Sequence, residues 1–147
     1  MKRCLCLYLL ALQCWAGSAF AADALQKNKN ESNSVKVETL MKTTQSWDGV
    51  DYGPYPIGHP ELSILKIEIP PNTTLPWHTH PMPNAAYVVR GSLTVETQSG
   101  QKLLLSEGDT LPETVDTVHR GTSGSQAVEL IVFYAGVKGQ SLNGPGH

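Results

Sequence analysis

Alternating apolar and polar residues give the clearest structural signal in this chain. In the segment ELSILKIEIP, residues 61–70, one parity carries Leu65, Ile67 and Ile69, whereas the other mixes apolar with charged side chains. Over residues 65–69 the first parity is wholly apolar. Because successive side chains of a β-strand point to opposite faces, this parity indicates a face that lies against a core. The segment is therefore predicted to be a half-buried strand with these three side chains inside.

Further segments of this kind follow along the chain, separated by turn residues. They are an edge strand at residues 35–44, a meander at residues 85–105 with turns at Gly91 and Gly100, a short strand after Gly108, and an apolar final strand at residues 127–136. No segment keeps a helical period over more than two turns. Short strands joined by glycine and proline turns predict an all-β sandwich or barrel.

The first residues of the chain differ from the rest. Lys2 and Arg3 precede an apolar run over residues 4–15, and small side chains stand at Ala19 and Ala21. A charged start, an apolar stretch and a small-x-small site form the order of a cleavable secretory signal. We place the cut after Ala21, which predicts a periplasmic or secreted bacterial protein.

Two other interpretations of this apolar run fit less well. A transmembrane anchor would need a longer apolar stretch, and Gln13 interrupts this one. A lipoprotein signal would use Cys14, but Gln13 is too large for the position before a modified cysteine. After cleavage we therefore expect no stable membrane anchor.

The remaining chain divides into three parts. A polar arm at residues 22–34 lacks periodicity and is predicted to be flexible, a β-domain follows at residues 35–137, and a flexible tail is predicted at residues 138–147. All three cysteines lie in the segment removed, so the remaining chain has neither disulfides nor thiolate chemistry.

Charge limits the class of partner. The chain has a formal net charge of −2, and loss of Lys2 and Arg3 makes it more acidic. A nucleic-acid partner is excluded because no basic stripe is present to neutralise phosphates. The expected class of partner is therefore a small molecule.

Two histidines one residue apart are the main candidate for chemistry. His78 and His80 project to the same face if the chain is extended there. A divalent ion held by imidazole needs about three such ligands for useful affinity, and His119 in a later strand-like segment is the third candidate. A histidine in a strand is more often packed or solvated, so the pair alone is weak evidence. The pair together with His119, with glycine turns between them, favours a metal site.

The residues around these histidines resemble the two sequence motifs of the cupin superfamily. The matching positions are His78, His80 and Gly91 in HTHPMPNAAYVVRG, and Gly108, Asp109 and His119 in EGDTLPETVDTVHRGTS. The resemblance covers residues 62–136. It implies a single jelly-roll β-barrel of two antiparallel sheets, with one divalent transition metal (Fe, Mn, Ni or Zn) bound inside near one mouth.

The chain also departs from these motifs. Asn84 stands where the first motif has a glutamate, and Thr114 and Asp116 replace the Pro-x-Gly turn of the second. Asn84 offers a neutral oxygen instead of a charge. The resemblance therefore implies three histidine ligands, with Asn84 either a weak fourth ligand or a residue behind the ligands.

Glu113 is a further candidate residue, upstream of the third histidine. It lies six positions before His119, at or just after the predicted short strand. It could turn inward and serve as a catalytic base or as a replacement carboxylate ligand. A solvated carboxylate at a strand end is the alternative.

Three functions follow from these features. The first is an exported metalloenzyme of the dioxygenase, isomerase or lyase type that acts on a small molecule. The second is a non-enzymatic barrel that binds a small ligand or a metal. The third is a metal-free barrel, which could form a homodimer through an edge strand.

Overall fold

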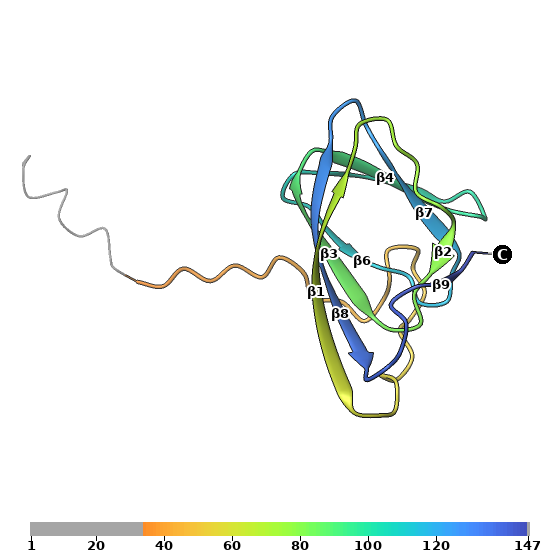
Figure 1. The fold of residues 1–147 in the computed structure, drawn as a ribbon. Coiled ribbons are helices and arrows are strands. Elements are labelled where there is room, and N and C mark those ends of the chain that lie inside the picture. Colours follow the sequence, from red (N-terminus) through yellow and green to blue (C-terminus); the bar gives the residue numbers. More distant parts are fainter. Residues whose placement is uncertain (1–33, 147) are drawn as a thin grey trace, which may run out of the picture. The chain divides into compact units, whose positions relative to one another are not determined.

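The structure is a computed structural model that describes residues 34–146. The chain divides into units 1–37 and 38–147, and all strands lie in the second unit. Nine strands and no helix occur in the described residues, and they form two antiparallel sheets (Figure 1). The first sheet has the order β1 (Pro60–Ile69), β8 (Val128–Val137), β3 (Asn84–Arg90) and β6 (Thr110–Pro112). The second has the order β5 (Lys102–Ser106), β4 (Ser92–Thr97), β7 (His119–Ser123), β2 (His78–Thr79) and β9 (Gly144–Pro145).

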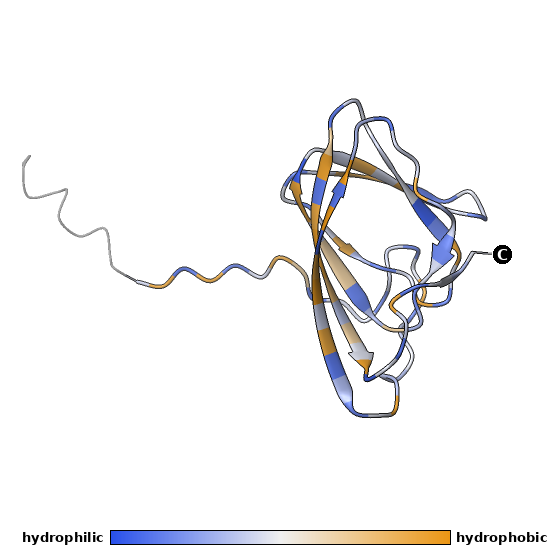
Figure 2. Cartoon of the chain, in the orientation of Figure 1, coloured by the Kyte–Doolittle hydropathy of each residue, from blue (hydrophilic) through white to orange (hydrophobic). Residues whose placement is uncertain are grey.

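The core lies between these sheets, which confirms the predicted all-β jelly roll. Its fully buried apolar side chains are Ile69, Met82, Ala86, Val88, Leu93, Val95, Leu105, Leu111, Val128, Leu130, Val132 and Tyr134. Burying one large aliphatic or aromatic side chain contributes about 1.5–3 kcal/mol, so these residues stabilise the sandwich without disulfides. Figure 2 shows the alternation of hydrophobic and hydrophilic residues along β1 and β8 that produces this core.

Strand β1 has the predicted orientation. Ile69 is buried, and Leu65 and Ile67 pack against the core. On the opposite parity, Leu62 and Ile64 are 68% and 71% exposed. The difference confirms that Leu65, Ile67 and Ile69 mark the buried face of this strand.

The tight turn between β3 and β4 requires glycine. Gly91 has a φ of 85°, in the left-handed region, and a Cβ added there would lie 2.4 Å from the carbonyl oxygen of Ala127. Gly100 and Gly108 also have positive φ, both 90°. All three predicted turns are therefore present.

The predicted edge strand at residues 35–44 is wrong, because residues 35–43 form no strand. The chain instead turns at residues 46–50 and packs against the end of β6, where the Trp47 amide donates a hydrogen bond to the Pro112 carbonyl at 2.9 Å. The apolar alternation at residues 35–37 is short. An alternation of this length is too short to determine whether the segment joins a sheet.

Two segments near the carboxyl end are more ordered than expected. Residues 119–123, which the sequence indicates only as a strand-like segment around His119, form the complete strand β7 between β4 and β2. Within the predicted flexible tail, Gly144 pairs with Thr79 and Pro145 with His78. A two-residue strand has no visible period, so the sequence pattern did not reveal it.

The predicted signal at residues 1–21, nearly all of the predicted arm at residues 22–34, and His147 lie outside the described residues. In the described part of the chain, no helix is long and apolar enough to cross a membrane.

Candidate metal centre

Strand pairing brings the three predicted histidines together. His78 of β2 lies directly opposite His119 of β7 in the antiparallel register. His80 follows two residues after His78 and turns to the same side. The ring centroids of His78 and His119 are 4.5 Å apart, and each lies 5.0 Å from the ring of His80.

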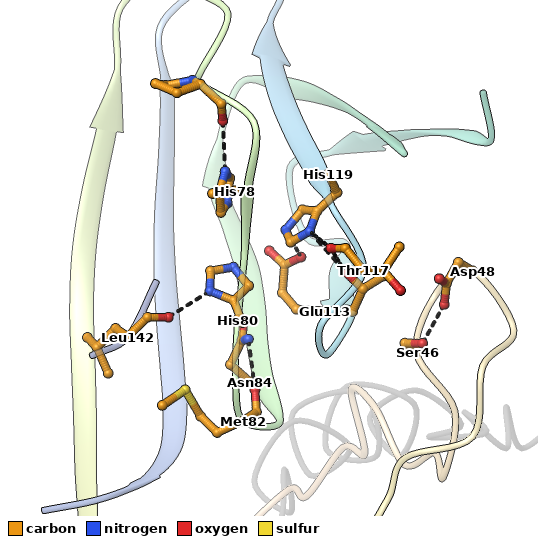
Figure 3. A network of polar contacts seen from close by, with 12 residues as sticks. Ser46, Asp48, His78, His80, Met82, Asn84, Glu113, Thr117, His119 and Leu142 are labelled. Atoms are coloured by element: carbon orange, nitrogen blue, oxygen red, sulfur yellow. Dashed lines mark hydrogen bonds and ion pairs between the residues drawn. The ribbon is translucent and has the colours of Figure 1, made fainter. Parts of the chain in front are cut away.

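Each imidazole is fixed by a backbone carbonyl on its outer side. The Nδ1 atoms of His78, His80 and His119 lie 2.8, 2.9 and 2.9 Å from the carbonyl oxygens of Pro76, Leu142 and Thr117 (Figure 3). A carbonyl oxygen only accepts hydrogen bonds, so every Nδ1 carries the proton. In the neutral rings, each Nε2 then has a free lone pair.

The potential ligand atoms of these histidines all lie within 4.8 Å of one another. His80 and His119 are buried, whereas His78 is half-buried and leaves one approach to the cluster. Nitrogen ligands bind first-row metals at about 2.0–2.1 Å. A cluster this close could therefore contact one ion after small side-chain rotations, and the carbonyl partners supply the outer support that metal-binding histidines usually have.

Glu113 extends the cluster by one carboxylate. Its Oε2 lies 3.3 Å from the Nε2 of His119, and its side chain is only 13% exposed. The two atoms are buried and have no hydrogen-bond partner among the described residues. A neutral Nε2 and a carboxylate oxygen each present a lone pair to the other. Their closeness therefore requires either a shared proton or a cation.

Backbone contacts hold Glu113 in this position. Its amide donates to the Asn84 carbonyl at 3.1 Å, and its own carbonyl accepts a hydrogen bond from the Tyr52 hydroxyl at 2.7 Å. The solvated position considered from sequence is therefore not the one observed. Glu113 lies beside the histidines, where it could act as a ligand or a base.

The electrostatic surroundings of the histidines differ. Burial lowers the pKa of His119, but the neighbouring Glu113 carboxylate favours the protonated ring and raises it, and the net result is a pKa above the ordinary value. Burial also lowers the pKa of His80, and there it prevails over the more distant Glu113 charge. In the absence of a metal, His119 beside Glu113 therefore holds a proton more readily than His80 does.

Asn84 has a different position. It is buried on β3, and its amide nitrogen donates to the Met82 carbonyl at 3.3 Å (Figure 3). It is not among the residues that line the histidine cavity, whereas Glu113 is. The carboxylate at the cluster therefore comes from the segment after β6 and not from the start of β3.

The turn that leads to His119 keeps its shape despite its unusual residues. Asp116, which replaces glycine in the second motif, has a φ of 57°, in the left-handed region that aspartate tolerates better than most residues. Thr114, which replaces proline, is completely buried, and its hydroxyl lies 2.9 Å from the Nδ1 of His119. Thr114 thus supports the imidazole, a role that the sequence did not suggest.

A cavity of about 300 Å³ opens beside the cluster. The polar side chains that line it are His78, His80, His119, Glu113, Tyr134 and Asn143. Its other walls are mainly aliphatic and come from both sheets. Such a cavity, with few polar groups at one place, has the composition of a small-molecule site.

Two contributors to this site were not predicted from sequence. Tyr134 of β8 is buried with its ring 5.6 Å from that of His80, and burial raises the pKa of its hydroxyl to about 12. Leu142 supplies the carbonyl that holds His80. The inward parity of β8 could have identified Tyr134, but no pattern in the tail could have identified Leu142.

Comparisons with known proteins agree with this architecture. Residues 65–134 match the family model described as cupin domain. A solved structure reported under "Crystal structures of DMSP lyases RdDddP and RnDddQII" is 19% identical, with a TM-score of 0.52, and the match covers 58% of this chain and 44% of that one. The DMSP lyase DddQ from Ruegeria pomeroyi DSS-3 is 16% identical, with a TM-score of 0.50 and coverage of 54% and 41%.

This chain therefore spans less than half the length of either solved protein. At such identities the likeness shows the fold alone. No curated protein matches the sequence significantly.

Proposed function

Because this chain belongs to the cupin superfamily, we propose that it binds one divalent transition-metal ion through His78, His80 and His119 and acts on a small molecule there. One observation supports the metal above all. Three separate carbonyls hold the three Nδ1 atoms, so that three Nε2 lone pairs face one small volume. A merely packed histidine would not need this common tautomer.

We assign Glu113 as the fourth ligand. Its Oε2 lies 3.3 Å from the Nε2 of His119, a separation that two ligands about 2.1 Å from one ion can adopt. Both atoms lack a hydrogen bond, and an ion would satisfy them together. Three neutral imidazoles and one carboxylate would leave a divalent ion with a net charge near +1, which favours a further anionic or polar ligand.

Iron, manganese, nickel and zinc all accept imidazole and carboxylate ligands. When bound, such an ion supplies a Lewis acid or an anchor for O₂, as dioxygenase, isomerase or lyase chemistry would use. The protein's own residues have simpler tasks. The aliphatic walls exclude water, Tyr134 presents a hydroxyl to the cavity, and half-buried His78 marks the approach.

A non-enzymatic binding protein is the second candidate. If Glu113 is a metal ligand, no other carboxylate among the described residues lines the cavity to serve as a base. The ion and cavity would then hold a small ligand without changing it. Turnover of a bound compound by the metal-loaded protein distinguishes the two functions.

We also propose that residues 1–21 direct export, since their charged, apolar and small-residue order is that of a secretory signal. Cell fractionation followed by amino-terminal sequencing tests this proposal. A periplasmic or secreted product that begins at Ala22 supports it, and an uncleaved cytoplasmic product contradicts it.

Elemental mass spectrometry of the purified protein tests the metal centre. We expect near-stoichiometric transition metal in the wild type and almost none in the double variant His78→Ala/His80→Ala. His59→Ala is the matched control, because His59 lies outside the cluster. Equal metal in all three proteins, or none after reconstitution of a folded wild type, would refute the metal centre.

A further inference from the structure

The cavity beside the histidines is polar at one end and apolar along the rest of its length. On β8, Tyr134 lies at the histidine end, followed inward along the same parity by Val132 and Leu130. On the facing sheet, His119 of β7 lies opposite Thr97, and the next cavity-lining cross-strand pair is Gly121 with Val95. Both sheets thus change from polar to apolar in the same direction.

The distance over which the walls are apolar is substantial. Tyr134 and Leu130 are four positions apart, and a strand rises about 3.3 Å per residue, so the wall extends roughly 13 Å from the polar end. Leu65 and Ile67 of β1 line the same stretch, paired with Val132 and Leu130. A ligand that reaches beyond the histidines therefore meets aliphatic side chains.

No lysine or arginine in the described part of the chain lines this cavity. Arg120 is adjacent in sequence to His119 but lies on the opposite parity of β7. Its guanidinium is bound to Glu96, with Nε 2.7 Å from Oε1, and stacks 4.2 Å from the centre of the Trp77 ring. The apolar end thus has no cation to receive a second anionic group.

Tyr134 provides a hydrogen-bond donor at the polar end. The residue is 3% exposed and lines the cavity, and its ring lies 5.6 Å from that of His80. A phenol ordinarily keeps its proton at neutral pH, so it can donate to an anionic oxygen. Buried tyrosine hydroxyls usually have a partner, and a bound ligand would supply one here.

We infer that the ligand of this site is a small amphipathic molecule with one oxygen-bearing head group, such as a monocarboxylate, and an apolar body. This inference rests on the proposed metal centre. The head group lies at the histidine end, where it accepts a hydrogen bond from Tyr134, and the body lies between Leu130 and Leu93. A volume of about 300 Å³ holds roughly ten non-hydrogen atoms, at about 30 Å³ for each water-sized group.

A matched pair of ligands tests this inference without any turnover assay. Hexanoate and adipate have the same number of carbons, but only adipate carries a carboxylate at both ends. We would load the purified protein with Co²⁺, confirm its content by elemental mass spectrometry, and titrate each ligand while recording the visible spectrum of the ion. We expect hexanoate to bind at least tenfold more tightly than adipate. Affinity should also rise up to about fourfold for each methylene added from acetate to hexanoate.

Two variants locate the binding groups. Tyr134→Phe should weaken hexanoate binding by roughly tenfold or more while leaving cobalt content unchanged, because it removes one hydrogen bond to a charged group. Leu75→Arg, at a half-buried position on the cavity wall, should shift the preference toward adipate. Thermal melting identifies any variant that fails to fold, and the wild-type ligand series does not depend on either variant.

The outcomes separate the two proposals. A folded wild type that takes up no cobalt overturns the metal centre and this inference together. A cobalt-loaded protein that binds adipate as tightly as hexanoate, or binds neither ligand, overturns the inference alone. A hexanoate preference that Tyr134→Phe leaves unchanged overturns the role assigned to the hydroxyl.

Discussion

Asn84 and Glu113 lie side by side but differ in what their side chains contact. The Glu113 amide donates to the Asn84 carbonyl at 3.1 Å, so the two backbones are neighbours at the end of the β3–β6 pair. The Glu113 carboxylate reaches the Nε2 of His119 and lines the cavity. The Asn84 amide instead bonds to the Met82 carbonyl, outside the lining of that cavity.

This difference shows that a carboxylate at one place in a fold can come from either of two adjacent segments of the chain. The motif glutamate of the first histidine segment would stand at Asn84, yet the carboxylate at the cluster belongs to Glu113, 29 positions later in the chain. Antiparallel pairing of Ala85 with Pro112 brings the two positions together. A metal ion responds to the position of an oxygen atom and not to its order in the sequence.

Removal of the Glu113 charge should produce the largest effect. Glu113→Gln keeps the shape of the side chain but removes the anionic oxygen, and we expect metal affinity to fall by roughly 100-fold or more, beyond the 10–100-fold typical of outer-shell partners. Competition with a chromogenic chelator measures the change. Glu107→Gln, at an exposed turn, is the matched control. Unchanged affinity with lost turnover would instead identify Glu113 as a base.

Moving the carboxylate back to β3 should reverse part of this loss. In Asn84→Glu/Glu113→Gln, the charge returns to the neighbouring position, and we expect about a tenfold recovery of metal affinity relative to Glu113→Gln alone, within the 10–100-fold range of such effects. The same chelator assay measures it. A well-folded double variant with no recovery would show that position 84 cannot reach the ion.

The proton shared by His119 and Glu113 predicts a pH effect in the metal-free protein. The folded-state pKa of His119 is raised above about 6.5, so the contact stabilises the fold below that pH and is lost as pH rises through the folded-state pKa. Glu113→Gln should therefore be more destabilising at pH 6 than at pH 9. Urea unfolding in the presence of a chelator measures both values, and equal destabilisation would contradict the shared proton.

The smallest effect is expected at Tyr52, which contacts the backbone of Glu113. Tyr52→Phe removes the hydroxyl that donates to the Glu113 carbonyl at 2.7 Å. We expect a loss of about 1 kcal/mol in the free energy of unfolding, the usual net value of one such bond, with metal affinity within about twofold of wild type. Tyr55→Phe, at a 72% exposed tyrosine, is the control. A large loss of metal would mean that Tyr52 positions the carboxylate.

Much of this site could be predicted from the sequence because strand geometry is regular. The two-residue period places His78 and His80 on one face, and strand pairing brings His119 opposite His78. The choice between Asn84 and Glu113 remained open for a physical reason. It depends on how the chain turns after β6, which side-chain alternation does not specify.

The two ends of the domain were harder to predict. Residues 35–37 alternate but belong to no strand, whereas residues 144–145 show no pattern and pair with β2. In both segments the neighbouring strand decides the conformation, and local preference contributes little. Sequence periodicity identified the long inner strands because their burial repeats over many residues.

The carbonyl of Leu142 has a consequence for the order in which the protein is made. His80 is 62 residues upstream of this carbonyl and depends on it for its tautomer, while β9 supplies the outer neighbour of β2. The pairs β1–β8, β8–β3, β3–β6 and β4–β7 need no residue after 137, but the support of the second histidine is incomplete until residue 142 is present. A chain that stops before this residue would therefore keep its long core strands and still lack the carbonyl that orients one of the three candidate metal ligands.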